Sequence, residues 1–196
     1  MLCAPVRYDP AWPEQFCSLK ERLLAADPAA CACWQIAHIG STAVPGLIAK
    51  PIIDIQIAAA RLEAVPLRSI EAAGFVAVPE ITQDDPLPGF PAMAQGWAKR
   101  YARLDQNGCR KAQLHIRVAG QANHRFALMM RDFLRADPEA AALYGQMKMA
   151  AAQIGGARSD PSGAGAYLHL KDPFVALLAR NAHHWAHAAG WAPPTE

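Results

Sequence analysis

The spacing of hydrophobic positions along the chain changes from helical to strand-like and back. An apolar stripe at helical spacing predicts a first helix from about Trp12 to Ala25, with Pro13 tolerated in its first turn. Apolar and strand-like patterns then predict strands at residues 34–39 and 52–58, the second with three isoleucines on one face. Residues 40–46 between them are polar, contain glycine and proline, and are expected to form a kinked connection.

The middle of the chain mixes short elements with one long irregular stretch. A helix is predicted within residues 62–73, ending at Gly74, and residues 75–78 predict a short strand. Residues 81–97 carry three prolines, and a structureless stretch of that length is either a functional lid or a passive insertion. The sequence leaves both interpretations open, although the first predicts that this loop borders the functional site.

A hairpin and a helical region complete the predicted fold. Asn107-Gly108 is a strong turn signal between residues 100–104 and 112–118, which are expected to pair. Helical patterns follow at residues 124–136, at residues 138–153 and, beyond a Gly- and Ser-rich loop at 154–165, up to about residue 189. We therefore predict one α/β (α+β) domain over residues 1–196, a mixed sheet flanked by helices with a helical C-terminal layer.

Composition excludes several classes of protein. A hydrophobic fraction of 53% supports a core, and a net charge of only +2 gives no case for binding nucleic acid or an anionic membrane surface. The first residues lack a secretion signal, and no apolar run approaches the roughly 18 residues needed to span a bilayer. The five cysteines have no metal-type spacing and are expected to be free thiols, so we expect a cytoplasmic protein.

The connection after the first strand has the composition of a phosphate-binding loop. Gly40 would let a bulky anion approach the backbone, while Ser41 and Thr42 would supply hydroxyl donors. Lys50 would bring a positive charge to the same neighbourhood. The alternative for Gly40-Ser41 alone is a tight turn with a capping hydroxyl.

A candidate metal site lies on the two central strands. Alternation places Asp54 and Gln56 opposite the isoleucines, and it places His115 and Arg117 together on one face of the later strand. Asp54, Gln56 and His115 could hold magnesium, and Arg117 suits bidentate contacts to phosphate. The alternatives are a buried salt bridge for Asp54 and a hydrogen-bonded core position for His115.

The stretch from His38 to Ile55, HIGSTAVPGLIAKPIIDI, closely resembles the signature of the GrpB family. Matching segments cover almost the whole chain: Tyr8–Trp12, Leu114–Val118, Arg131–Arg135, Tyr144 with Lys148, and Lys171 with Phe174. That family belongs to the nucleotidyltransferase superfamily and is found alone or fused behind dephospho-coenzyme A kinase. The resemblance implies a nucleotidyltransferase-type fold, with the Gly40-Ser41 loop holding a nucleotide phosphate and Asp54 holding the metal.

One departure from the superfamily pattern bears on activity. Active members of the superfamily pair two acids on the strand where this chain has Asp54 and Gln56, and a third acid is expected where it has His115. A single carboxylate neutralises a divalent cation poorly, so we expect weak Mg²⁺ binding that improves when a phosphorylated ligand supplies oxygens. The GrpB family itself tends to lack the second acid.

Further residues are candidates to contact the ligand or a metal. His38 belongs to the signature, while Arg100, Arg103, Lys148 and Lys171 either line an anion-binding cleft or are simply solvated. His183 and His187 share a helix face but lack further ligands, so a polar face is favoured over a zinc site.

Two functional hypotheses follow from the sequence. The first is a protein that binds a nucleotide or another phosphorylated small molecule and transfers a nucleoside monophosphate with Mg²⁺. In that scheme Asp54, His115 and Lys50 would carry the catalysis. The second is a non-catalytic ligand-binding or folding-accessory module related to the domain fused to dephospho-coenzyme A kinase.

Overall fold

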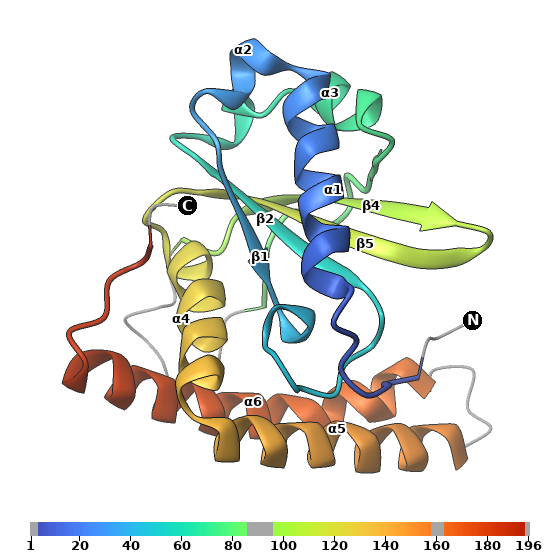
Figure 1. The fold of residues 1–196 in the computed structure, drawn as a ribbon, viewed down its shortest axis with the longest axis vertical. Coiled ribbons are helices and arrows are strands. Elements are labelled where there is room, and N and C mark those ends of the chain that lie inside the picture. Colours follow the sequence, from blue (N-terminus) through green and yellow to red (C-terminus); the bar gives the residue numbers. More distant parts are fainter. Residues whose placement is uncertain (1–3, 86–95, 158–162, 195–196) are drawn as a thin grey trace.

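The computed structural model describes residues 4–85, 96–157 and 163–194, with the backbone alone at 155–157 and 163–171. These residues form a five-stranded mixed sheet with helices on both faces (Figure 1), which confirms the predicted fold class. The strands are β1 Gln35–Ile39, β2 Ile53–Ala59, β3 Val76–Ala77, β4 Lys99–Gln106 and β5 Cys109–Val118. The helices are α1 Trp12–Ala26, α2 Pro28–Cys31, α3 Leu67–Ala72, α4 Ala122–Ala136, α5 Pro138–Ala157 and α6 Gly163–Ala188. Two 3₁₀ turns, η1 Ser41–Ala43 and η2 Leu62–Ala64, complete the elements.

The sheet has the strand order β1-β2-β5-β4-β3. β2 runs parallel to β5, and the other neighbouring pairs are antiparallel. The β4–β5 hairpin turns at Asn107 and Gly108, whose φ angles of 53° and 73° are those of the turn that this dipeptide favours. The sequence therefore predicted this hairpin and its turn correctly.

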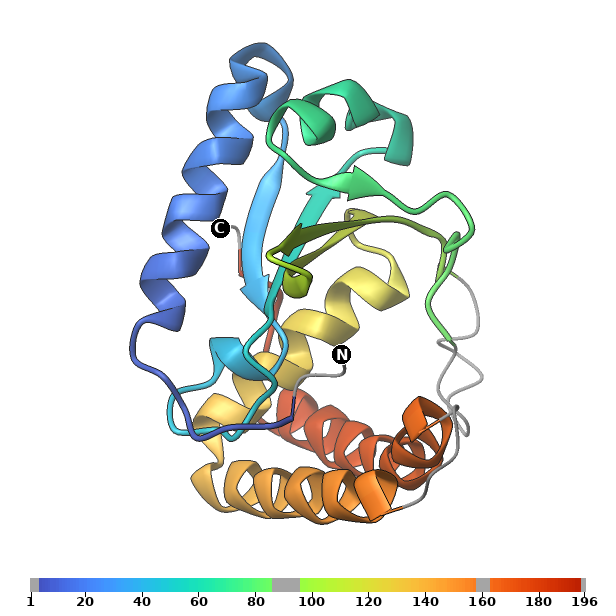
Figure 2. The ribbon, with the colours of Figure 1, turned by 90° about the vertical axis from the view of Figure 1, so that its right-hand side faces the viewer.

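Strand alternation gives the sheet one apolar and one polar face at its centre. Ile55 of β2 lies level with Leu114 of β5 on the face that packs against α1 and α3. Asp54 and Gln56 lie level with Gln113 and His115 on the other face. Figure 2 shows α1 on one side of the strands and α4 on the other. The candidate functional side chains therefore lie on the α4 side of the sheet.

A second apolar cluster joins α4, α5 and α6 below the sheet. Phe133 of α4 and Tyr144 of α5 pack with Leu178 of α6, and the connection after η1 contributes Val44 and Leu47. The antiparallel α5–α6 pair runs across the lower end of the molecule in Figures 1 and 2. Within the described residues, no helix has the length and apolar character needed to cross a bilayer.

The helix expected within residues 62–73 is α3, which follows Pro66; residues 62–64 form η2, and Pro66, with ψ of 133°, is in an extended conformation between the two. One predicted boundary differs from the structure. The loop expected over residues 154–165 is helical at both ends, since α5 continues to Ala157 and α6 begins at Gly163. The proposed lid lies largely in residues 86–95, which are outside the described residues.

The apolar face of β2 should be the most sensitive part of the core. Ile55 is completely buried, so Ile55→Ala should lower the free energy of unfolding by about 2–5 kcal/mol through lost burial and a residual cavity. Val76 is 60% exposed on β3, so Val76→Ala should change it by about 0.5 kcal/mol or less. Urea unfolding of both variants tests this, and equal losses would contradict the assignment of the core.

Candidate functional site

A cavity of about 370 Å³ lies where the ends of β1 and β2 meet α4, α5 and α6. Its polar lining comes largely from the sheet and η1, and its apolar lining comes largely from the helices. The described lining residues are Ile39, Gly40, Ser41, Asp54, Gln113, His115, Arg117, Phe126, Ala127, Met130, Arg131, Leu134, Tyr144 and Val175. The structure thus brings Gly40, Ser41, Asp54 and His115 to one concave site, as strand alternation predicted.

The carboxylate of Asp54 lies directly against the backbone of Gly40. A Cβ atom at Gly40 would collide with Oδ2 of Asp54, and the φ of 69° at Gly40 is a conformation that other residues rarely adopt. Glycine at this position therefore makes room for a protein carboxylate, whereas the sequence had suggested room for a bound anion. The Asp54 side chain remains 28% exposed to the cavity.

His115 is oriented by its two neighbours. Its Nδ1 lies 3.5 Å from an Nη atom of Arg117, which can only donate, so Nδ1 is the acceptor and Nε2 carries the proton. That Nε2 lies 3.8 Å from Oδ1 of Asp54. Burial lowers the pKa of His115 below its ordinary value despite the nearby carboxylate, so the ring is neutral at pH 7. His115 therefore presents an N–H group to Asp54.

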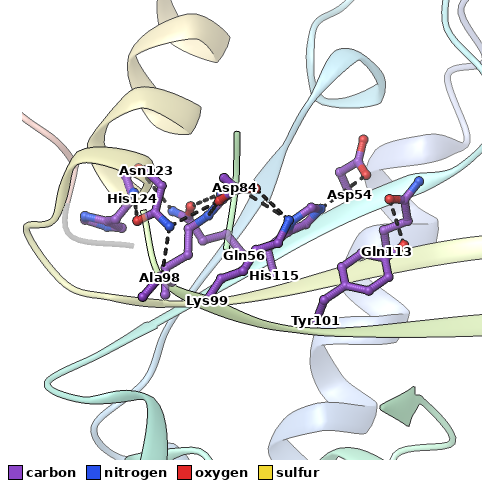
Figure 3. A network of polar contacts seen from close by, with 11 residues as sticks. Asp54, Gln56, Asp84, Ala98, Lys99, Tyr101, Gln113, His115, Asn123 and His124 are labelled. Atoms are coloured by element: carbon purple, nitrogen blue, oxygen red, sulfur yellow. Dashed lines mark hydrogen bonds and ion pairs between the residues drawn. The ribbon is translucent and has the colours of Figure 1, made fainter. Parts of the chain in front are cut away.

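Arg117 is held by protein partners on several sides. It donates to Oε1 of Gln56 at 2.6 Å and, through Nε, to Oδ2 of Asp84 at 2.9 Å. Asp84 also accepts from Lys99 at 2.6 Å and from Asn123 at 3.1 Å (Figure 3). Burial alone would raise the pKa of Asp84, but Arg117 and Lys99 outweigh it and hold that pKa below its ordinary value. The network fixes the position of Arg117 beside the cavity.

A positively charged side chain of the helical layer contacts the η1 turn. Nζ of Lys148, on α5, donates to Oγ of Ser41 at 2.9 Å and lies 4.5 Å from the ring centroid of Tyr144. Lys148 is only 4% exposed. Arg131 of α4, also buried, donates to the carbonyl oxygen of His38 at 3.0 Å. Both cations thus hold the backbone and the hydroxyl that border the cavity.

Three predicted ligand contacts lie elsewhere. His38 is on the opposite face of β1, where its ring stacks on Phe16 with centroids 4.8 Å apart. Thr42 is buried, and its hydroxyl is occupied by Nε2 of His38 at 3.0 Å and the Ile52 carbonyl at 3.3 Å. Arg100 projects from the apolar face of β4 and donates to the Leu62 carbonyl at 3.2 Å. Because side chains alternate along a strand, His38 and Arg100 face away from the cavity. The hydroxyl of Thr42 stabilises the turn.

Other predicted residues have mixed positions. Lys50 precedes β2 and is not among the described lining residues of the cavity. Lys171 lies in α6, and its side chain is outside the described part of the structure. Gln56 faces the correct side of the sheet but is only 1% exposed, with Oε1 bound to Arg117 and Nε2 3.5 Å from the His124 carbonyl.

Sequence reasoning missed several groups around the cavity. Lys99 lies opposite Arg117 and Tyr101 lies opposite His115, so the alternation along β4 could have selected them once the hairpin register was known. No local sequence pattern indicates a role for Asp84. It lies outside the strands, and it contacts Lys99 and Arg117 of the sheet only through the tertiary fold. Tyr144 and Arg131 fell within the segments that resemble the GrpB family but had no assigned role.

The donor set suits at most a weakly held divalent cation. Asp54 is a partly exposed carboxylate in the cavity, whereas Gln56 is engaged with Arg117 and His115 directs a proton, not a lone pair, toward Asp54. Within residues 4–85, 96–157 and 163–194, no group of three or more His, Cys, Asp or Glu side chains is placed to bind a metal. Magnesium readily completes its coordination with water and substrate phosphates, so Asp54 alone fits such a role.

Comparison with known proteins identifies the family. The model of the family described as GrpB protein matches residues 5–181. The chain belongs to the GrpB family. The crystal structure of the conserved protein GrpB from Enterococcus faecalis superimposes with a TM-score of 0.71 at 30% identity, covering 92% of this chain and 99% of that one. The fold and the family assignment therefore agree.

Curated relatives of this GrpB-family chain are longer. It is 35% identical over 210 residues to a dephospho-CoA kinase from Mycolicibacterium paratuberculosis, covering 97% of this chain and 49% of that protein. It is 34% identical over 184 residues to the UPF0157 protein YqkA from Bacillus subtilis, covering 92% of this chain and 47% of that protein. The chain thus spans about half the length of these relatives.

The contact between Gly40 and Asp54 can be tested with two glycines at positive φ. Gly40→Ala and Gly46→Ala both introduce a side chain at positive φ, and at Gly40 the ψ of −169° lies in a region that is almost restricted to glycine, a strain of about 1–3 kcal/mol. A Cβ at Gly46 meets nothing within 4 Å, whereas one at Gly40 meets Asp54. Urea unfolding should show a larger loss for Gly40→Ala, and equal losses would contradict close packing of Asp54 on this glycine.

The buried His38 should make stability depend on pH. Burial lowers its pKa from 6.5 to about 4, so the unfolded chain binds a proton more readily than the folded protein. Its contribution is complete above pH 6.5 and is lost as the pH falls toward 4, by up to about 3 kcal/mol at about 1.4 kcal/mol per pKa unit. Urea unfolding from pH 7 to pH 4 should show a smaller loss for His38→Gln than for the parent; identical pH profiles would refute the prediction.

Proposed function

We propose that the cavity beside Asp54 binds a nucleotide or another phosphorylated small molecule and that Mg²⁺ strengthens this binding. The observation that carries the proposal is a partly exposed carboxylate, Asp54, beside a glycine-serine turn that is held by the buried cation Lys148. Phosphate oxygens accept hydrogen bonds from such a turn, and magnesium is commonly shared between one carboxylate and substrate phosphates.

The two halves of the cavity lining suit different parts of such a ligand. Ser41 supplies a hydroxyl at one end, where phosphate oxygens would lie, and the buried Lys148 places a positive charge behind that hydroxyl. Phe126, Met130 and Leu134 supply apolar surface from α4, against which a flat base would pack. A volume of about 370 Å³ is within the range of small-molecule sites, roughly 300–1,000 Å³.

The proposed reaction is transfer of a nucleoside monophosphate from a nucleoside triphosphate to the hydroxyl of a small acceptor, with pyrophosphate as the leaving group. Bound magnesium would offset negative charge on the transferring phosphate. Asp54 would hold that cation or accept the acceptor's hydroxyl proton, and the N–H of His115 would help to keep the carboxylate oriented. Arg117 and Lys148 would contribute fixed positive charge, which stabilises developing negative charge most effectively when it is preorganised.

The second candidate is a non-catalytic ligand-binding or folding-accessory module. Two observations favour it: Gln56 is engaged with Arg117 at the position where a second acid would help to hold a metal, and the chain spans about half the length of relatives named dephospho-CoA kinase. Such a module would keep the cavity and its ligand but would not turn the ligand over. The two candidates differ in their dependence on magnesium.

Calorimetric titration of nucleoside triphosphates with and without Mg²⁺ separates the candidates. If Asp54 holds the cation, Mg²⁺ should tighten nucleotide binding, and Asp54→Asn should remove the magnesium-dependent part and any turnover with little loss of fold. Asp105→Asn is the control, because it removes the same charge from the exposed hairpin. Nucleotide affinity that ignores Mg²⁺ in the parent would refute the metal-assisted function and leave the accessory module.

Gln56→Asp provides a second arm of the same titration. From sequence alone, a restored acid pair would be expected to bind magnesium more tightly. In the structure, the new carboxylate would lie beside the guanidinium of Arg117, which already donates to this position at 2.6 Å. We therefore expect an ion pair with Arg117 and no gain in magnesium affinity. A gain of about tenfold or more would show that a carboxylate at this position can share a cation with Asp54 despite Arg117.

A further inference from the structure

A second cavity, of about 500 Å³, lies between the start of α4 and the end of α6. Phe126 lines both cavities, so the two are neighbours. The second cavity shares none of the candidate catalytic residues and is independent of the function proposed above. Its described lining combines Met129, Phe126 and Trp191 with side chains that can carry positive charge.

The ionisable side chains among the described residues of this lining are all basic. Arg125 comes from α4, and His183 and His187 come from successive turns of α6, so three side chains able to hold or develop positive charge face one space. No acidic side chain is among the described residues that line it. The fixed positive charge of Arg125, with no acidic side chain in the described lining to offset it, favours an anion.

The aromatic wall of the second cavity is fixed in place. Nε1 of Trp191 donates to Asp132 at 3.0 Å, and its backbone N–H donates to the Ala186 carbonyl at 2.8 Å. The guanidinium of Arg125 lies 5.9 Å from the Trp191 ring centroid, within cation–π range. Arg125 is exposed, yet this contact limits its freedom, so less conformational entropy is lost when it binds an anion.

We propose that this cavity binds a small organic phosphate whose ring or apolar group packs beside Trp191. Arg125 would make paired hydrogen bonds to the phosphate oxygens, and His183 and His187 would donate further ones from α6. Met129 and Phe126 would contact the apolar part of the ligand. The protein would then hold two ligands in neighbouring cavities, one beside Asp54 and one beside Arg125.

Phenyl phosphate is a suitable probe because it combines the two groups and contains no nucleotide. Titration followed by calorimetry and by backbone amide NMR should show binding with shifts at Gly120, which lines this cavity, and weaker binding of uncharged phenol. Arg125→Gln should lower the affinity for phenyl phosphate by about tenfold or more, since a charged hydrogen-bond partner is lost. His187→Gln should lower it by a smaller factor.

His184→Gln is the matched control, since His184 is exposed on the same helix but does not line the cavity. It should leave the affinity for phenyl phosphate unchanged. Equal affinity in the parent and Arg125→Gln, equal affinity for phenol, or shifts confined to Gly40 would overturn the proposal. Nucleotide titrations are followed separately at Gly40, so failure of the first cavity to bind nucleotide leaves the result for the second one unaffected.

Discussion

The parallel pairing of β2 with β5 is the constraint on which the candidate site depends. In this register Asp54 lies beside Gln113, and Gln56 lies beside His115. Their side chains share one face of the sheet, while the isoleucines between them enter the core with Leu114. Because side chains alternate along a strand, a slip of one residue would bury the carboxylate and expose the isoleucines. The hydrophobic core on one face of the sheet therefore enforces the alignment of the polar groups on the other.

The distribution of charge explains why Asp54 differs from the other acid of this region. Asp84 is matched by Lys99 and Arg117, so its charge serves to fix the network beside β5. Arg117 is in turn shared between Asp84 and Gln56. Asp54 has a different environment, with a neutral histidine 3.8 Å away and part of its side chain open to the cavity. A carboxylate in such a setting attracts a cation or a hydroxyl donor, which is why we propose Asp54 for the chemistry and a positioning role for the Arg117 network.

Sequence patterns were most informative where a local signal sufficed. Alternation and the Asn107-Gly108 turn predicted the strands and hairpin, and alternation on two strands was enough to place Asp54 and His115 together. Prediction failed where position depends on register or distant contacts. Arg100 was chosen because it is a cation near the strand, but its neighbour Lys99 has the parity that faces Arg117. The contact of Lys148 with Ser41, 107 residues apart, depends on tertiary packing that no local pattern encodes.

The helical layer also donates three hydrogen bonds to the segment at and after the end of β1. Arg131 donates to the His38 carbonyl and Arg135 donates to the Ala43 carbonyl. Lys148 donates to the hydroxyl of Ser41. These three bonds join residues that are far apart in the chain, so the conformation of η1 depends on docking of α4 and α5. The free energy needed to open the site locally can therefore differ from the free energy needed to unfold the sheet. A local opening that undocks these helices would release η1 while the isoleucine core stays folded, so binding competence would be lost at a lower free energy than the fold itself.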